Sequence, residues 1–199
     1  MFTGITQTVG QVITNESHTK NNQHITIETK TPYFSEATIG DSIMVDGVCL
    51  TITHKTDHTA KFGIMRPTYE TTIIGDYMMR QSVNLEKAIS AGERFDGHFV
   101  LGHVDGKAEI VNKQVINNTI LLSFKPKESI LMREIVAKGS VAILGVSLTV
   151  IEKTSQTFQI GLIPHTQLQT TLSKLTVGHW VNIETDILAK YMTGGQYVG

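Results

Sequence analysis

Three side chains in this sequence carry groups that can take part in covalent or acid–base chemistry: the thiol of Cys49, the hydroxyl of Ser147 and the imidazole of His103. An activated thiol or hydroxyl can act as a nucleophile, and an imidazole can take or give a proton near neutral pH. Each residue also has an ordinary structural explanation. A lone cysteine in a strand is usually a small core residue, a serine on a strand can bond a neighbouring backbone group, and a histidine between glycine-rich turns can face solvent. The choice depends on the pattern around them.

Cys49 and Ser147 occupy the same position in two copies of one pentapeptide. Residues 47–51 read GVCLT and residues 145–149 read GVSLT, an offset of 98. The same offset relates residues 62–65 to 160–163 and residues 83–86 to 181–184. A constant offset indicates two copies of one domain, because chance similarity would drift out of register. The period is too long for a solenoid repeat, whose units run to about 50 residues, and it fits two compact domains joined within residues 87–97.

The two copies differ at positions that are suited to chemistry. A thiol becomes a hydroxyl, an aliphatic side chain becomes an imidazole, and an amide becomes a carboxylate: Cys49 to Ser147, Ile5 to His103 and Gln7 to Asp105. Positions that both halves need for packing should stay alike, so these differences mark where each half specialises. We therefore expect two similar cradles that carry different reactive groups.

The elements that must hold these groups are short strands. Polar and apolar residues alternate, or β-branched residues cluster, as is typical of antiparallel strands. A tight hairpin turn is expected at Asp46 and Gly47. About six strands per copy would leave unpaired edges in an open sheet, and closure into a barrel removes them. The predicted strands are residues 10–14, 24–29, 42–45, 48–53, 60–65 and 82–85 in the first copy, and 108–115, 119–124, 140–143, 146–152 and 157–163 in the second.

Helices are few in this prediction. Asp186 can cap a helix in the tail, and Gly194 with Gly195 would end it. A helix added to two finished barrels must bury its apolar side, so we expect a partner subunit to cover it. The predicted helices are residues 34–37, 69–74, 129–137 and 186–192, and the predicted domain boundaries are 1–88, 98–186 and 187–199.

Composition narrows the classes of partner and cofactor. The 199 residues have a formal net charge of −1 and no block of like charge, which argues against nucleic acid or an anionic membrane surface as the partner. A single cysteine excludes an intrachain disulfide and favours a reducing cytoplasm. The N-terminus lacks the pattern of a secretory signal, and no apolar run reaches the roughly 18 residues of a membrane span. No spaced Cys/His set or glycine-rich nucleotide motif is present, so neither a metal nor a dinucleotide cofactor is expected.

Several longer motifs, in this order, give the sequence a family resemblance. Beside the two pentapeptides they are MFTGI at residues 1–5, GDSI at 40–43, VNLE at 83–86, GHFVLGHVDG at 97–106, KGS at 138–140, LIPHT at 162–166 and VNIETD at 181–186. Over nearly its full length the chain resembles the riboflavin synthases of the alpha-subunit type, which are built from lumazine-binding domains. The resemblance implies an all-β fold: two tandem, homologous, six-stranded antiparallel Greek-key barrels and a short C-terminal helix.

The resemblance also implies a transferase reaction, the last step of riboflavin biosynthesis. Two molecules of 6,7-dimethyl-8-ribityllumazine exchange a four-carbon unit to give riboflavin and 5-amino-6-ribitylamino-uracil, without a metal or an organic cofactor. In the family each barrel holds one substrate, and the N-terminal barrel of one subunit faces the C-terminal barrel of its neighbour in a homotrimer. Association with lumazine synthase is a further partner relation that the family suggests. The alternative is a non-catalytic lumazine- or flavin-binding protein of the fluorescent type, which tends to lose the reactive side chains that this sequence keeps.

The resemblance assigns roles to residues within these motifs. His103, or a water that it orients, is expected to take a proton from the 7-methyl group of one lumazine. Cys49 and Ser147 are expected either to add to the second lumazine or to hydrogen-bond to its ring. Threonine hydroxyls and strand-end amides would bind the ring, and Lys138 and Asp186 would contact the ribityl chain or the ring. The substrate-binding set is Phe2, Gly4, Ile5, Thr6, Ser42, Leu50, Thr51, Gly63, Ile64, Met65, Arg66, Pro67, Thr68, Val104, Asp105, Lys138, Leu148, Thr149, Leu162, Ile163, Pro164, His165, Thr166 and Asp186.

Overall fold

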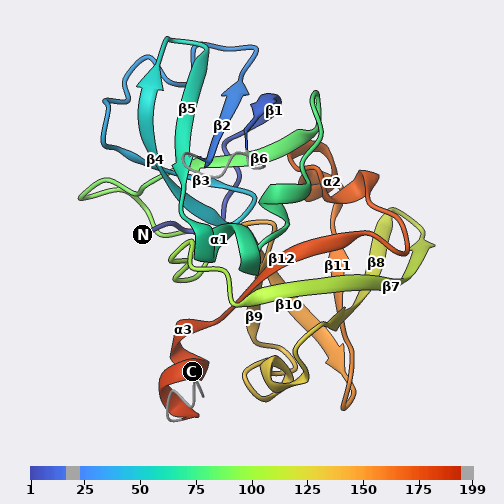
Figure 1. Ribbon diagram of the computed structural model, residues 1–199. Helices are drawn as coiled ribbons and strands as arrows, with labels where there is room; N and C mark the ends of the chain where they lie inside the picture. The colour runs from blue at the N-terminus through green and yellow to red at the C-terminus, as the bar shows by residue number, and fades with distance from the viewer. Residues whose placement is uncertain (17–22, 194–199) are drawn as a thin grey trace.

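The computed structural model describes residues 1–16 and 23–193, and they form two closed barrels (Figure 1). Around the N-terminal barrel the neighbouring strands follow the order β1-β2-β5-β4-β3-β6. The last strand, β6, therefore lies beside β3, the first strand of the β3–β4–β5 meander, which is a Greek-key arrangement. The strands of this barrel are β1 (Thr8–Asn15), β2 (Gln23–Glu28), β3 (Ser42–Val45), β4 (Val48–Lys55), β5 (Thr59–Ile64) and β6 (Ser82–Lys87).

The C-terminal barrel repeats this topology strand for strand. Its closed order is β10-β11-β8-β7-β12-β9, which is the order of the first barrel once equivalent strands are matched. All strand pairs in both barrels are antiparallel within the described residues, so the predicted pair of six-stranded antiparallel barrels is confirmed. The strands are β7 (Gly106–Ile116), β8 (Thr119–Pro126), β9 (Ser140–Ile143), β10 (Val146–Lys153), β11 (Phe158–Leu162) and β12 (Trp180–Thr185).

The alternation of side chains along each strand separates a core face from an outer face. In β4, Val48 and Leu50 are buried, while Cys49 between them is only partly buried. In β10, Ser147 has the same intermediate exposure between two buried neighbours. Because successive side chains of a strand point to opposite faces, the thiol and the hydroxyl both project away from the barrel cores.

Two short α-helices occupy equivalent places in the two halves. They are α1 (Arg66–Thr71) and α2 (Pro164–Gln169), and each has a proline in its first turn. Proline is tolerated there because the amide it lacks would have no helical partner. The 3-10 helices η1 (Ile73–Asp76) and η3 (Leu172–Lys174) follow them. The helix predicted over residues 69–74 thus overlaps α1 but starts too late, and α2 was not predicted.

Two predicted helices are wrong for one shared reason. Residues 34–37 lie in a turn, and within residues 129–137 only the 3-10 helix η2 (Ser129–Arg133) forms. At both places a lysine from the neighbouring strand donates to carbonyl groups that a continuing helix would otherwise use. Lys55 Nζ lies 2.6 and 3.0 Å from the carbonyl oxygens of Phe34 and Ser35, and Lys153 Nζ lies 2.7 and 2.6 Å from those of Met132 and Ile135.

The tail forms the predicted helix. α3 (Ile187–Met192) begins after Asp186, whose side chain accepts a hydrogen bond from the amide of Leu188 at 3.0 Å, so the predicted N-cap is confirmed. Figure 1 shows α3 at the lower left, where the chain leaves β12 and runs beside the C-terminal barrel. The predicted end at Gly194 and Gly195 lies outside the described residues.

Two buried asparagines join the barrels. Asn84 and Asn182 are equivalent residues, and each side chain bonds two main-chain groups of the opposite half. Paired in this way, they satisfy buried backbone groups that the barrels alone would leave unpaired. Asn84 contacts the carbonyl of Leu144 and the amide of Thr171 at 3.1 and 2.9 Å, and Asn182 contacts the carbonyl of Asp46 and the amide of Ile73 at 2.9 and 2.8 Å.

The predicted tight turn between β3 and β4 is confirmed. Asp46 and Gly47 have φ values of +43° and +86°, as a type I′ turn requires. A Cβ on Gly47 would lie 2.9 Å from the amide nitrogen of Gly145, in the equivalent turn of the other barrel. The two turns therefore meet at the seam between the barrels, at a distance that only glycine allows.

Candidate active site

A cavity of about 330 Å³ brings Cys49 and His103 together. This volume is within the range of small-molecule sites. The wall combines β4 and α1 of the N-terminal barrel with the loop that precedes β7 of the C-terminal barrel. The lining residues are Val48, Cys49, Met65, Pro67, Thr68, Thr71, Thr72, Gly102, His103 and Val104. Six of them belong to the set predicted from the sequence: Cys49, Met65, Pro67, Thr68, His103 and Val104.

Backbone contacts hold Cys49 and His103 on the same wall. The amide of Cys49 donates to the carbonyl oxygen of Gly102 at 2.9 Å, which holds the residue before His103 against β4. A Cβ on Gly102, where φ is +78°, would lie 2.5 Å from the Cβ of Cys49. The thiol itself packs beside a small apolar cluster between the barrels that contains Phe2 and Val100. Cys49 is therefore a seam residue and not a core residue of its barrel.

The equivalent position in the other half has different chemistry. The amide of Ser147 donates to the carbonyl of Gly4 at 2.8 Å, which repeats the backbone contact of Cys49. Its hydroxyl lies 2.7 Å from Nδ1 of His98. Burial lowers the pKa of His98 below its usual value, although the charge of Asp186 opposes this. Nε2 of this ring is buried and has no hydrogen-bond partner among the residues that the structure describes.

His98 is a site residue that the sequence analysis missed. It lies inside the motif GHFVLGHVDG, but a comparison of the two halves gives it no counterpart, so no difference between halves drew attention to it. The motif itself could have indicated His98, because it contains a second histidine five residues before His103. Its contact with Ser147 is long-range and appears only in the fold.

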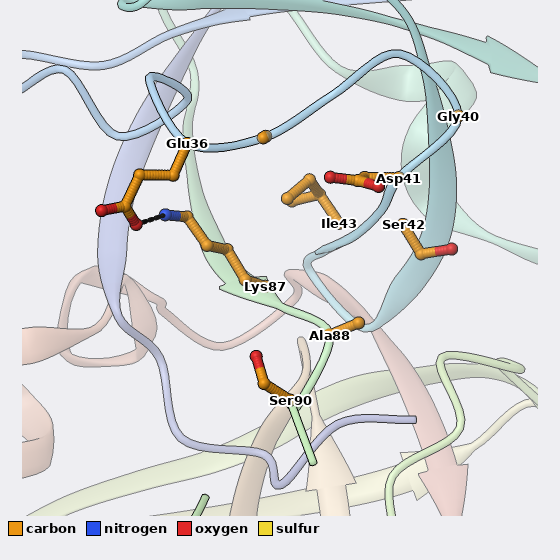
Figure 2. A pocket seen from close by; sticks show the side chains of 9 residues that line it. Glu36, Gly40, Asp41, Ser42, Ile43, Lys87, Ala88 and Ser90 are labelled. Atoms are coloured by element: carbon orange, nitrogen blue, oxygen red, sulfur yellow. Dashed lines mark ion pairs between the residues drawn. The ribbon is translucent and has the colours of Figure 1, made fainter.

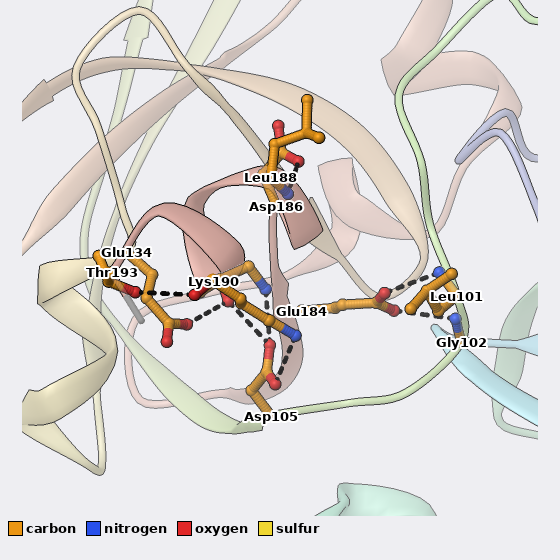
Figure 3. A network of polar contacts seen from close by, with 10 residues as sticks. Leu101, Gly102, Asp105, Glu134, Glu184, Asp186, Leu188, Lys190 and Thr193 are labelled. Atoms are coloured by element: carbon orange, nitrogen blue, oxygen red, sulfur yellow. Dashed lines mark hydrogen bonds and ion pairs between the residues drawn. The ribbon is translucent and has the colours of Figure 1, made fainter. Parts of the chain in front are cut away.

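Two buried glutamates hold the loops that carry these groups. In the N-terminal half, the carboxylate of Glu86 accepts from the amides of Thr3 and Gly4 at 2.6 and 3.0 Å. In the C-terminal half, Glu184 accepts from the amides of Leu101 and Gly102 at 2.7 and 3.0 Å (Figure 3). Burial raises the pKa of both, that of Glu184 to about 7, while the hydrogen bonds from these amides oppose the rise. The loop before His103 is thus positioned by a carboxylate that titrates near neutral pH.

A second cavity of about 630 Å³ lies on the N-terminal barrel near β3 and the end of β6 (Figure 2). Ser42, a predicted binding residue, is part of its wall and pairs with Thr51 of β4. Polar side chains also reach the wall from Glu36, Asp41, Lys87 and Ser90. Lys87 forms an ion pair with Glu36 at 3.6 Å across one side. The other lining residues are Ala37, Gly40, Ile43 and Ala88.

The remaining predicted residues fall into three groups. Phe2, Leu50, Ile64, Leu148 and Leu162 have buried side chains, so these positions can offer a ligand only main-chain groups. Asp105 is turned away from the cavity toward Thr185 and Lys190 (Figure 3). The third group lies on the outer surface of the barrels or at their seam, and its members do not line the cavity with Cys49 and His103. They are Gly4, Ile5, Thr6, Gly63, Arg66, Lys138, Thr149, Ile163, Pro164, His165, Thr166 and Asp186.

Metal-binding clusters and membrane-spanning helices are both absent from the described residues. None of their groups of His, Cys, Asp and Glu has three or more members placed to hold a metal ion. The helices in the same part of the chain are all too short or too polar to cross a bilayer.

Comparison with known proteins identifies both halves. The lumazine binding domain matches residues 3–88 and again residues 101–186. Riboflavin synthase of Bacillus subtilis is 40% identical over 96% of this chain and 88% of its own length, and that of Schizosaccharomyces pombe is 36% identical over 96% and 91%. Among solved structures, LumP complexed with 6,7-dimethyl-8-(1'-D-ribityl) lumazine matches with a TM-score of 0.82 over 93% of this chain and 99% of that chain. At 23% identity this structure supports the fold alone. With both barrels matched by the lumazine binding domain and near full-length identity to riboflavin synthases, the chain belongs to the riboflavin synthase family of enzymes.

Proposed function

We propose that the protein is a riboflavin synthase that converts two molecules of 6,7-dimethyl-8-ribityllumazine into riboflavin and 5-amino-6-ribitylamino-uracil by transfer of a four-carbon unit. The observation that carries the proposal is the cavity in which Cys49 and His103, from different barrels, share a wall. The 40% identity to the riboflavin synthase of Bacillus subtilis supports it. The two products together contain all the atoms of the two substrates, so the exchange needs no external oxidant or reductant.

The first step is removal of a proton from the 7-methyl group of the donor lumazine. His103 is the base: its side chain is exposed at the cavity wall, and the hydrogen bonds of Glu184 hold the loop before it. The proton passes to the imidazole, and the electron pair of the C–H bond delocalises into the ring. A positioned base of this kind contributes about 10²- to 10⁴-fold to a rate. Cys49, on the same wall, hydrogen-bonds to the ring of this lumazine.

In the second step a nucleophile adds to C7 of the acceptor lumazine, and this addition activates the acceptor ring for attack by the carbanion of the donor. Ser147 and His98 form a nucleophile–base pair, with the hydroxyl oxygen 2.7 Å from Nδ1. Because burial lowers the pKa of His98, the neutral imidazole that can accept a proton is favoured. As Oγ bonds to C7, the hydroxyl proton moves to His98 and a ring electron pair moves to nitrogen. The proton returns to Oγ when the C–O bond breaks.

The 630 Å³ cavity supplies a place for the ribityl chain of the lumazine held by the N-terminal barrel. A ribityl chain carries several hydroxyl groups, each of which can donate and accept hydrogen bonds. Ser42, Asp41 and Lys87 offer both kinds of partner on one wall. Ser42 connects this cavity to the residues that would bind the lumazine ring, since it pairs with Thr51 in the β3–β4 ladder.

Assembly as a homotrimer is part of the proposal. The outer side of α3 presents Leu188, Tyr191 and Met192, which are 57%, 78% and 89% exposed. An apolar surface of this kind on a short helix is stabilised by burial against other subunits. Such an assembly would place the donor cradle of one subunit opposite the acceptor cradle of its neighbour.

A lumazine carrier is the second candidate, because the LumP fold, solved with a bound lumazine, matches with a TM-score of 0.82. Incubating the purified protein with 6,7-dimethyl-8-ribityllumazine alone separates the two. A synthase forms riboflavin over many turnovers, and its green fluorescence rises with time. A carrier forms a stable fluorescent complex at one lumazine per binding site, with no riboflavin, and that outcome would exclude the enzymatic proposal.

A further inference from the structure

A buried ion pair ties α3 to the loop that carries His103. Lys190 Nζ donates to Asp105 Oδ1 at 2.6 Å, and the two side chains are only 9% and 6% exposed (Figure 3). Asp105 is two residues beyond His103. A lysine and an aspartate are almost never this buried unless they are paired. The helix and the loop are therefore held together through these two charges.

The loop is held on both sides of His103. Before it, Glu184 accepts from the amides of Leu101 and Gly102. After it, Asp105 Oδ2 accepts from the amide of Thr185 at 2.8 Å. Both sets of bonds come from the last two residues of β12, directly before the tail. Movement of this end of the chain would move the imidazole.

The other half shows what the loop needs when it carries no histidine. Gln7 stands at the position of Asp105, and its Oε1 accepts from the amide of Lys87 at 2.9 Å, in the same register as the bond from Thr185 to Asp105. At the position of Lys190 the first half has Gly92, so the charge pair has no counterpart there. That loop carries Ile5 where the second carries His103.

Stability alone does not account for the pair. Removing two charges from water carries a large free-energy cost, and the attraction between them often fails to offset it. A neutral amide already closes the first barrel at the equivalent place. Lys190 is in contact with the carboxylate of Asp105 and interacts at longer range with that of Glu184. What the second half gains is a fixed distance between α3 and the loop of His103.

We propose that Lys190 is a positioning residue for His103, acting through its buried contact with Asp105. The inference rests on the proposed function, in which His103 is the base. It adds that the tail helix controls the catalytic geometry and does more than extend the fold.

The test compares Lys190→Met with Lys113→Met. Lys113 lies in β7 of the same barrel, and its ammonium is also satisfied internally, by the carbonyls of Ser173 and Leu175 at 2.9 and 2.6 Å. Both variants lose an internally bonded ammonium, but only Lys190→Met releases the loop of His103. We expect kcat to fall about 10- to 100-fold in Lys190→Met with KM within about 2-fold, because misplacing a reacting group has effects of this size. Lys113→Met should lower the unfolding temperature and keep kcat.

A second readout does not depend on turnover. The imidazole resonances of His103, assigned with the His103→Gln variant, should shift or broaden in Lys190→Met, stay unchanged in Lys113→Met and recover in Lys190→Arg. An unchanged His103 spectrum, or an equal loss of kcat in the two methionine variants, would overturn the proposal. If the unmodified protein forms no riboflavin, the proposed function fails, and the His103 spectra still decide whether Lys190 positions the ring.

Discussion

The amide of Cys49 donates a hydrogen bond to the carbonyl oxygen of Gly102 at 2.9 Å, and this bond crosses from one barrel to the other. It sets the thiol beside the residue that precedes His103. The equivalent bond, from Ser147 to Gly4, sets the hydroxyl beside the residue that precedes Ile5. One backbone geometry, used twice, therefore sets the thiol next to the loop of His103 and the hydroxyl next to the loop of Ile5, where His98 supplies the imidazole.

Adding a methyl group at Gly102 should separate the two barrels where they meet. In Gly102→Ala the new Cβ would lie 2.5 Å from the Cβ of Cys49 and 2.8 Å from its amide nitrogen, so the loop of His103 must move. Gly178→Ala is the matched control, since Gly178 also has positive φ, +90°, but nothing within 4 Å of the added atom. Both variants should lose about 1–2 kcal/mol of unfolding free energy from the left-handed backbone, measured with urea. Only Gly102→Ala should lose turnover, and equal turnover in both would contradict the role of this contact.

Removing the reactive groups should affect turnover more than binding. His103→Gln keeps a polar side chain of similar size but removes the base, so kcat should fall about 10²- to 10⁴-fold. Cys49→Ala should also lower kcat, because the thiol lines the same cavity. Lumazine affinity, measured by fluorescence titration, should change by less than about tenfold, or about 1.4 kcal/mol, in each. If both variants turn over at the unmodified rate, this assignment of the cavity is wrong.

The seam between the barrels should depend on its two asparagines. Asn84→Ala leaves the carbonyl of Leu144 and the amide of Thr171 without these partners, and each buried unpaired group costs about 1–3 kcal/mol. We expect a loss of about 2–5 kcal/mol of unfolding free energy by chemical denaturation. Asn112→Ala, at an exposed asparagine of β7, should change it by less than about 0.5 kcal/mol. Matching losses in the two variants would mean that the interbarrel bonds contribute little.

The buried carboxyl of Asp46 should make stability depend on pH. Burial raises its pKa to about 7, although hydrogen bonds from Tyr77 and Asn84 oppose the rise. In the unfolded chain an aspartate ionises near pH ~4, so the stabilising contribution of the protonated form is present below about pH 4 and is lost as the pH rises to about 7. In Asp46→Asn the side chain cannot ionise, so this loss of stability with rising pH is absent. The free energy of unfolding of the variant, measured from pH 4 to pH 7, should fall less steeply than that of the unmodified protein.

The exposed Asp57 provides the comparison for that measurement. Asp57→Asn also removes one carboxylate, but from the surface. Its pH dependence should follow the unmodified protein. If Asp46→Asn and Asp57→Asn give the same slope, the buried carboxyl is not the source.

The sequence predicted what depends on local pattern. Alternation placed the strands, and the constant offset placed Ser147 opposite Cys49, because both signals repeat along the chain. The prediction failed where a side chain far away in the sequence determines the local structure. A helix was expected over residues 129–137, but Lys153 donates hydrogen bonds to two carbonyl groups of this segment, those of Met132 and Ile135. Nothing in the sequence of the segment itself indicates these bonds.

The site residues, too, include some that the sequence pattern predicted and some whose contacts it could not predict. His103 and Cys49 were predicted from the differences between the halves and from the family motif, and they line one cavity. Asp105 was predicted to bind substrate from its motif, and that motif gives no sign of the bond between its carboxylate and Lys190, a residue 85 positions away. The contact of His98 with Ser147 spans 49 residues and has no equivalent in the first half. Such pairings depend on barrel closure and not on spacing.

The product ratio tests the central claim most directly: two identical molecules, held in two unlike cradles, react with each other. The purified protein is given 6,7-dimethyl-8-ribityllumazine as its only substrate, and all three compounds are separated and quantified over time. We predict that two lumazines disappear for each riboflavin formed, with one 5-amino-6-ribitylamino-uracil released alongside. Lumazine that stays bound and unconverted, with neither product detectable, would contradict the account.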